Sequence, residues 1–129
     1  MTNRKEAYRK KREKMIEEKG VTAFRTAETE VLAEISRKSG YVIATGGGIV
    51  TVDENYDLVH QNSTVVFVDR DINELASDGR PLTAKHGVKK LYEERIYRYN
   101  SWSDIKVRVH GINETALDII HKLDINEGK

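Results

Sequence analysis

The sequence of 129 residues contains no cysteine and a single proline. Without cysteine, the chain can form neither a disulfide nor a thiolate metal site. No apolar run approaches the roughly 20 residues that a membrane-spanning helix needs, and the first residues lack the apolar core of a signal peptide. The formal net charge of +1 gives no overall field that would favour nucleic acid or a membrane surface. We therefore expect a cytoplasmic protein of one small domain that binds neither nucleic acid nor membrane.

The sequence is organised around three consecutive glycines, Gly46, Gly47 and Gly48. Residues 41–44, directly before them, form a short apolar run with a β-branched centre, which predicts a buried parallel strand. Ligands of open α/β sheets bind outside the carboxyl ends of the strands, and glycine lets a ligand reach the backbone N–H groups. The run is therefore a candidate floor of a ligand site. A flexible turn without a ligand explains the same three residues equally well.

The other apolar periodicities predict helices that alternate with strands. We expect helices at residues 3–19, 22–38, 53–59, 70–76, 88–100 and 113–123, and strands at residues 64–68 and 104–110. Polar loops are expected at residues 78–87 and a loose tail at residues 124–129. Strands that alternate with helices predict an α/β fold with a parallel, doubly wound sheet.

The first predicted helix is rich in basic residues and has a thin apolar face. One interpretation is a binding arm for a polyanion. The other is a solvated helix with ion pairs between residues four positions apart, and the mixed charges favour this second interpretation. In the second and last helices, the helical spacing predicts that the buried residues are Phe24, Val31, Leu32, Ile35, Ala116, Leu117, Ile120 and Leu123.

Five sequence blocks, in this order and spacing, resemble shikimate kinase. They are residues 24–28, 42–50, 53–55, 79–82 and 91–95. The resemblance extends from about residue 15 to residue 123 and is closest to the kinase part of shikimate dehydrogenase/shikimate kinase fusions. It implies a P-loop-kinase-like fold, here truncated to about three strands with flanking helices. Residues 1–20 are then a charged N-terminal helix, residues 21–123 the shikimate-kinase-like region and residues 124–129 the tail.

The resemblance implies a role for each residue of the substrate site. Arg25 resembles the arginine that grips the shikimate carboxylate, and Glu28 resembles the residue that orients it. A guanidinium binds a carboxylate through two parallel hydrogen bonds, which lysine cannot do. Gly46, Gly47 and Gly48 resemble the backbone contacts to the substrate. On their own, Arg25 and Glu28 are three positions apart in a predicted helix and would make an ordinary surface pair.

Two further arginines are implied by the same resemblance. Arg80 resembles the lid arginine that neutralises charge on the phosphate during transfer. Arg95 resembles a second arginine for the carboxylate, although Tyr97 stands where the family usually has proline. Without the resemblance, Arg95 would be interpreted as one half of a salt bridge and Arg80 as a solvated loop charge.

The sequence departs from the family at the nucleotide site. A kinase of this family uses ATP and Mg, and it needs the Walker A run Gly-x-x-x-x-Gly-Lys-Ser/Thr to cradle the phosphates. These 129 residues contain no such run, and the family's acidic pair on the second strand is missing as well. The four histidines, at positions 60, 86, 110 and 121, show no ligand spacing. We therefore expect that this chain alone binds neither ATP nor a metal ion.

Three functions remain open. The chain is either part of an enzyme for ATP-dependent phosphorylation of the shikimate 3-hydroxyl, in chorismate and aromatic amino-acid biosynthesis, or a non-catalytic relative that binds shikimate or a similar hydroxy acid. The third function is that of a dimerisation module. The family's strand order, 2-3-1-4-5, leaves this chain with counterparts of strands 3, 4 and 5 only. Because the missing strand lies between two of them, exposed strand edges predict a homodimer.

Overall fold

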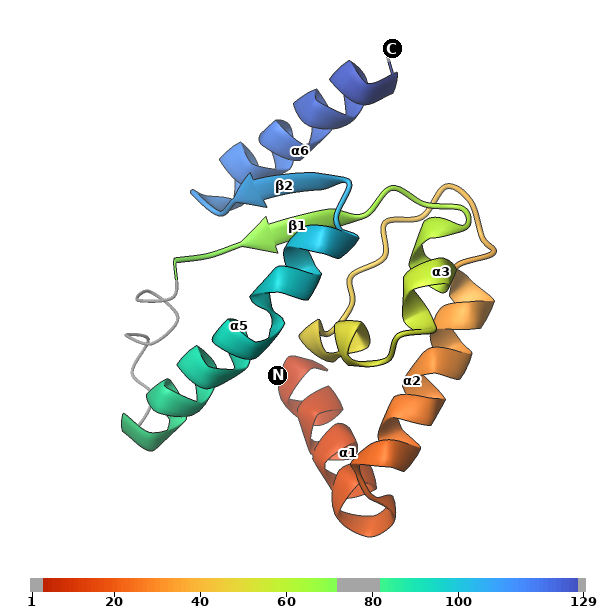
Figure 1. The fold of residues 1–129 in the computed structure, drawn as a ribbon, viewed down its shortest axis with the longest axis vertical. Coiled ribbons are helices and arrows are strands. Elements are labelled where there is room, and N and C mark those ends of the chain that lie inside the picture. Colours follow the sequence, from red (N-terminus) through yellow and green to blue (C-terminus); the bar gives the residue numbers. More distant parts are fainter. Residues whose placement is uncertain (1–3, 72–81, 128–129) are drawn as a thin grey trace. The chain divides into compact units, whose positions relative to one another are not determined.

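The structure is a computed structural model that describes residues 4–71 and 82–127 (Figure 1). The chain divides into two compact units, Met1–Ser63 and Thr64–Lys129. In the described part of the chain, no helix is both long and apolar enough to cross a membrane. The predicted helix at residues 70–76 and the loop around Arg80 fall mostly within residues 72–81, outside the described residues.

The first unit is helical. It contains α1 (Arg4–Lys19), α2 (Val21–Ile35), the short 3-10 helix η1 (Gly47–Thr51) and α3 (Asn55–His60). Gly20 separates α1 from α2 with φ 89°, a left-handed conformation that glycine adopts without strain. Pairs four positions apart, such as Lys10–Glu6 and Arg9–Glu13, lie along the exposed surface of α1. These pairs agree with the interpretation of α1 as a solvated helix.

The prediction of a strand at residues 41–44 is wrong. These residues have no strand structure, and the side chains of Tyr41 and Val42 are 69% and 103% exposed. A strand exists only when a neighbouring strand satisfies its N–H and C=O groups. Within the described residues, none pairs with this segment. Because the segment joins no sheet, Tyr41 and Val42 stay exposed.

The second unit is built on a small parallel sheet. Strand β1 (Val66–Asp69) pairs with β2 (Ile105–Arg108), and the register places Asp69 beside Arg108. In β2 the buried Ile105 and Val107 alternate with the exposed Lys106 and Arg108, as the sequence predicts. Helices α5 (Leu82–Trp102) and α6 (Ile112–Glu127) flank this sheet (Figure 1). The chain thus has an α/β fold with flanking helices, but the described sheet has two strands and not three.

The helices of the second unit are longer than the sequence predicts. Helix α5 already begins at Leu82, so residues 83–87 are helical and do not form a loop. Helix α6 continues to Glu127, so the expected loose tail is helical as far as that residue. Leu117 and Ile120 of α6 are 65% and 55% exposed, whereas the prediction placed them inside. In the first unit, Val31 of α2 is likewise exposed and not buried.

Candidate functional site

The candidate site lies in the first unit and begins with an ion pair on α2. Because Arg25 and Glu28 are three positions apart, the helix brings their side chains together. Nη1 of Arg25 donates a hydrogen bond of 2.9 Å to Oε1 of Glu28. The two side chains are only 24% and 19% exposed, so the pair is half-buried. The guanidinium also lies over the ring of Phe24, with its Cζ 5.2 Å from the ring centroid.

The glycine run lies against this ion pair. Gly48 is buried, and a β-carbon at residue 48 would overlap the guanidinium of Arg25. A β-carbon at Gly46 would lie 3.7 Å from Oε2 of Glu28, an ordinary contact. The structure therefore brings the glycine run together with Arg25 and Glu28, which the sequence predicted as parts of one site. The close approach of the Arg25 side chain accounts for the glycine at residue 48, and the ligand floor and the flexible turn stay alternative predictions for the run.

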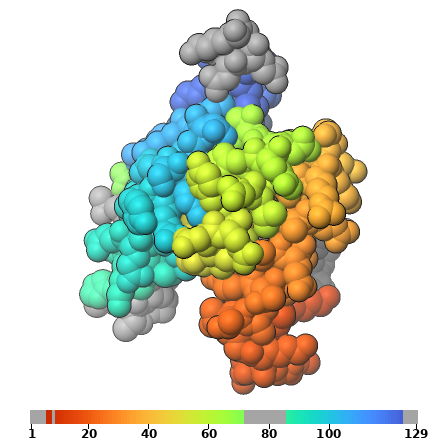
Figure 2. Space-filling model, turned by 45° about the vertical axis from the view of Figure 1, so that its right-hand side comes forward, coloured from red at the N-terminus to blue at the C-terminus, as the bar shows by residue number. Residues whose placement is uncertain are grey.

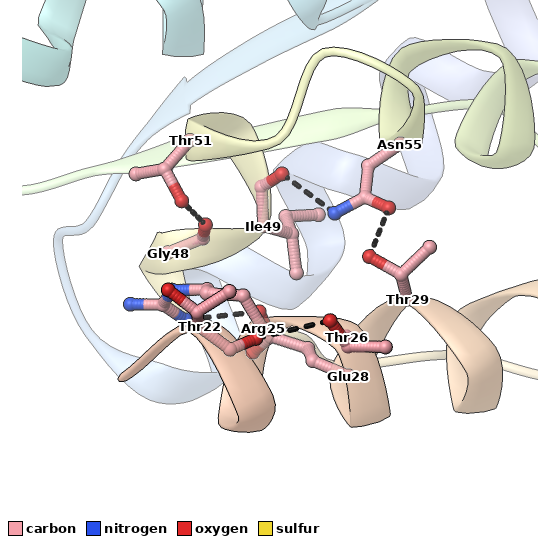
Figure 3. Close-up of polar contacts among 9 residues, drawn as sticks. All are labelled: Thr22, Arg25, Thr26, Glu28, Thr29, Gly48, Ile49, Thr51 and Asn55. Carbon is pink, nitrogen blue, oxygen red and sulfur yellow. Dashed lines mark hydrogen bonds and ion pairs between the residues drawn. The ribbon is translucent and has the colours of Figure 1, made fainter. Parts of the chain in front are cut away.

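Helices α2 and α3 and the 3-10 helix η1 pack together in the first unit, and Figure 2 shows η1 and α3, in yellow and yellow-green, on the orange α2. A single side chain connects the three elements. Asn55, the first residue of α3, is 0% exposed. Its Oδ1 accepts a hydrogen bond of 2.9 Å from Oγ1 of Thr29, and its Nδ2 donates one of 2.9 Å to the carbonyl oxygen of Ile49 (Figure 3).

Sequence reasoning assigned no side-chain role to Asn55 or Thr29. One signal was present, because Thr29 lies four positions after Arg25 and so on the same face of α2. A third polar contact supports η1 itself: Oγ1 of Thr51 donates a hydrogen bond of 2.6 Å to the carbonyl oxygen of Gly48 (Figure 3).

The other two predicted arginines belong to the second unit in the sequence. Arg95 lies on α5 in the second unit, where its side chain is half-buried. Arg80 lies outside the described residues. Their predicted roles beside the substrate therefore stay predictions.

The second unit has its own polar cluster, around Asp69 at the end of β1. The Asp69 carboxylate is 2% exposed and accepts a hydrogen bond of 3.3 Å from the hydroxyl of Tyr92. Its Oδ2 lies 3.8 Å from Nζ of Lys106 and 3.6 Å from Nη2 of Arg108. Burial raises the pKa of Tyr92, and the negative charge of Asp69 raises it further. Two cations balance the buried carboxylate, so this cluster needs no additional ion.

Among the described residues, no three histidine or acidic side chains come together in a way that could hold a metal ion. The sequence contains no Walker A run that could cradle the phosphates. The expectation that this chain alone binds neither ATP nor a metal ion stays a prediction. The described site offers a half-buried guanidinium, which suits the binding of an anion.

The sequence of this chain is similar to those of known proteins. The sequence model of the shikimate kinase family matches residues 4–124. The shikimate kinase of Clostridium botulinum (strain Alaska E43) is 35% identical over 115 residues, which cover 84% of this chain and 70% of that protein.

Two solved structures are similar in fold. The crystal structure of shikimate kinase from Aquifex aeolicus gives a TM-score of 0.77 at 32% identity and covers 90% of this chain and 73% of that chain. Shikimate kinase from Acinetobacter baumannii, solved in complex with shikimate, gives a TM-score of 0.73 at 24% identity, over 88% of this chain and 69% of that chain. By sequence and by fold, the chain belongs to the shikimate kinase family.

Proposed function

We propose that the cluster of Arg25, Glu28 and the glycine run binds the carboxylate of shikimate. The observation that carries this proposal is the half-buried guanidinium of Arg25, which Glu28 holds in place against Gly48. A family member was solved in complex with shikimate, which supports the choice of ligand. A similar hydroxy acid would satisfy the same donors.

The chemistry of the guanidinium suits this role. It presents five N–H donors in a rigid plane, and Glu28 accepts from Nη1, so other N–H groups stay available for a second anion. Partial burial strengthens the attraction between opposite charges, because less water screens them. Gly46 and Gly47 are exposed and carry no side chain that would keep a ligand away from the backbone, while Gly48 supports the guanidinium. We assign Arg95 to the same carboxylate and Arg80 to the charge of the phosphate.

In this proposal the chain carries the substrate half of a shikimate kinase. The family reaction is ATP-dependent phosphorylation of the shikimate 3-hydroxyl, with Mg, in the pathway to chorismate. Because these 129 residues lack the Walker A run, the ATP half must come from other residues. We further propose a cytoplasmic homodimer, truncated relative to the family and related to the dehydrogenase fusions. In this proposal, residues 1–129 are one domain that contains the shikimate-kinase-like region at residues 21–123.

A second candidate is a non-catalytic relative that binds a small hydroxy acid or serves as a dimerisation module. The absence of the Walker A run from these 129 residues favours it. The kinase part and the acid-binding relative share the carboxylate site and differ in whether residues outside this chain complete a kinase, whereas a dimerisation module does not need to bind shikimate.

A pair of measurements tests the proposal. Calorimetric titration of the chain with shikimate should show binding, and a coupled kinase assay with ATP and Mg should show no turnover by this chain alone. Absence of binding would contradict the proposed site. Turnover that disappears when Mg is removed would contradict the assignment of the ATP half to other residues.

A further inference from the structure

We propose that Asn55 and Thr29 are positioning residues that hold the glycine run against Arg25 and thereby set the affinity of the carboxylate site. This inference rests on the proposed function, because the affinity in question is that for shikimate. Neither residue touches the ligand in this account. They act through the distance between Gly48 and the guanidinium.

The first step of the argument is the path of the hydrogen bonds. Thr29 lies one helical turn after Arg25 on α2, and Ile49 directly follows Gly48 in η1. The amide of Asn55 joins these two neighbours through hydrogen bonds of 2.9 Å each (Figure 3). One buried side chain thus connects the element that carries the arginine with the element that carries the glycine.

The second step is the chemistry of residue 55. The position needs an acceptor for the hydroxyl of Thr29 and a donor for the carbonyl oxygen of Ile49, and the asparagine amide supplies both. Aspartate keeps the acceptor but turns an oxygen toward that carbonyl oxygen. Since Asn55 is 0% exposed, water cannot replace a lost partner without opening the structure.

The third step is that η1 has its own support. The hydroxyl of Thr51 donates to the carbonyl oxygen of Gly48. The 3-10 helix η1 can therefore persist when Asn55 no longer connects it to α2. Loss of this connection is expected to leave the unit folded while the glycine run moves relative to Arg25.

A purely structural role, the joining of α2 and α3, is the competing explanation, and the chain offers a matched control for it. Just after the C-terminal ends of the same two helices, Nε2 of Gln61 donates a hydrogen bond of 3.0 Å to Oγ of Ser36. Ser36 is 2% exposed and Gln61 is exposed, so this contact is part-buried. It joins the same elements but lies away from the glycine run.

The experiment compares four single substitutions by calorimetric titration with shikimate and by thermal unfolding. Thr29→Val, which keeps the shape of the side chain and removes its hydroxyl, should weaken shikimate binding about 5- to 10-fold. Thr29→Ser, which keeps the hydroxyl, should bind like the wild type. Ser36→Ala should lower the melting temperature and leave the affinity unchanged. Asn55→Asp is a fourth variant, expected to weaken binding as Thr29→Val does.

A double-mutant cycle separates positioning from a general loss of structure. If Thr29 acts through the guanidinium, Thr29→Val should have no further effect on shikimate affinity in an Arg25→Ala background. Equal affinity of Thr29→Val and the wild type, or an equal loss in Ser36→Ala, would overturn the inference and leave the proposed function standing. Equal effects of Thr29→Val with and without Arg25 would also overturn it. Failure of the wild type to bind shikimate would overturn both.

Discussion

The guanidinium of Arg25 occupies the space that a β-carbon on Gly48 would fill, so a larger residue there would push this flexible end of the arginine away. The contact accounts for the glycine at residue 48, which is buried beneath the arginine. The position of the guanidinium, and with it the proposed carboxylate site, depends on the missing side chain.

Gly48→Ala should therefore impair the site. The added methyl group overlaps the guanidinium and pushes the flexible end of Arg25 away from Glu28, which we expect to cost up to about 1 kcal/mol of unfolding free energy through the weakened ion pair. Shikimate affinity should fall on the order of tenfold. Urea denaturation and calorimetric titration measure the two effects.

Gly46→Ala is the matched control in the same run. Its new methyl group makes an ordinary contact, and φ at Gly46 is −72°, which alanine adopts freely. We expect its unfolding free energy to stay within about 0.5 kcal/mol of the wild type. If Gly48→Ala were equally harmless, the contact with Arg25 would be adjustable and the site would not depend on it.

Substitutions at Gly87 test whether residues 83–87 form the start of helix α5, as in the structure, or a loop, as the sequence predicts. The space around a β-carbon at Gly87 is open, so Gly87→Ala should raise the free energy of unfolding by about 0.5–1 kcal/mol. Gly87→Pro should lower it by about 3 kcal/mol, because proline lacks the N–H that a helix interior needs. Urea denaturation decides between the helix and the loop, because a well-tolerated proline would mean that residues 83–87 form a loop.

The raised pKa of Tyr92 predicts a specific loss of stability at alkaline pH. Its pKa in the folded chain lies above the usual value of about 10, chiefly because of burial and secondly because of Asp69. As the pH rises above 10, the unfolded chain therefore loses this proton first. The contribution of Tyr92 to stability is complete below pH 10 and falls as the pH rises through the folded-state pKa.

Tyr92→Phe should remove that part of the pH dependence. Urea unfolding between pH 8 and pH 11 (a range chosen to bracket the usual pKa of about 10) should show a shallower alkaline decline for the variant than for the wild type. Tyr97→Phe is the control, because the side chain of Tyr97 is 65% exposed. An identical decline in Tyr92→Phe and the wild type would show that the phenol does not contribute.

The mass in solution tests the proposed homodimer. Tyr41 and Val42 are exposed, and in the described part of the chain β1 pairs on one edge only. Such edges are templates for pairing with a second chain. Light scattering should therefore give about twice the chain mass of 14.8 kDa. A mass of one chain, with a cooperative melt at micromolar concentration, would contradict the dimer.

The parts of the fold that could be predicted are those set by local spacing. Residues three positions apart on a helix must face the same side, so Arg25 and Glu28 meet as expected. The alternation of Ile105 and Val107 with Lys106 and Arg108 likewise follows from the two-residue period of a strand.

The parts that could not be predicted depend on distant partners. Residues 41–44 have the composition of a strand, but a strand also needs a neighbour, which local sequence does not reveal. Asn55 looks like an ordinary polar residue at a helix start. Its burial depends on Thr29, 26 positions away, and no periodicity connects the two.

The central claim is that the guanidinium of Arg25 binds the carboxylate of shikimate, and one calorimetric experiment tests it directly. Wild type, Arg25→Ala and the control Arg37→Ala, an exposed arginine after α2, are titrated with shikimate and with its methyl ester. Arg25→Ala should weaken shikimate binding by about 1.5–3 kcal/mol, the scale of a hydrogen bond to a charged group. It should change ester binding little, and Arg37→Ala should change neither. Equal shikimate affinity of Arg25→Ala and the wild type would contradict the account and leave Arg25 as a structural ion pair.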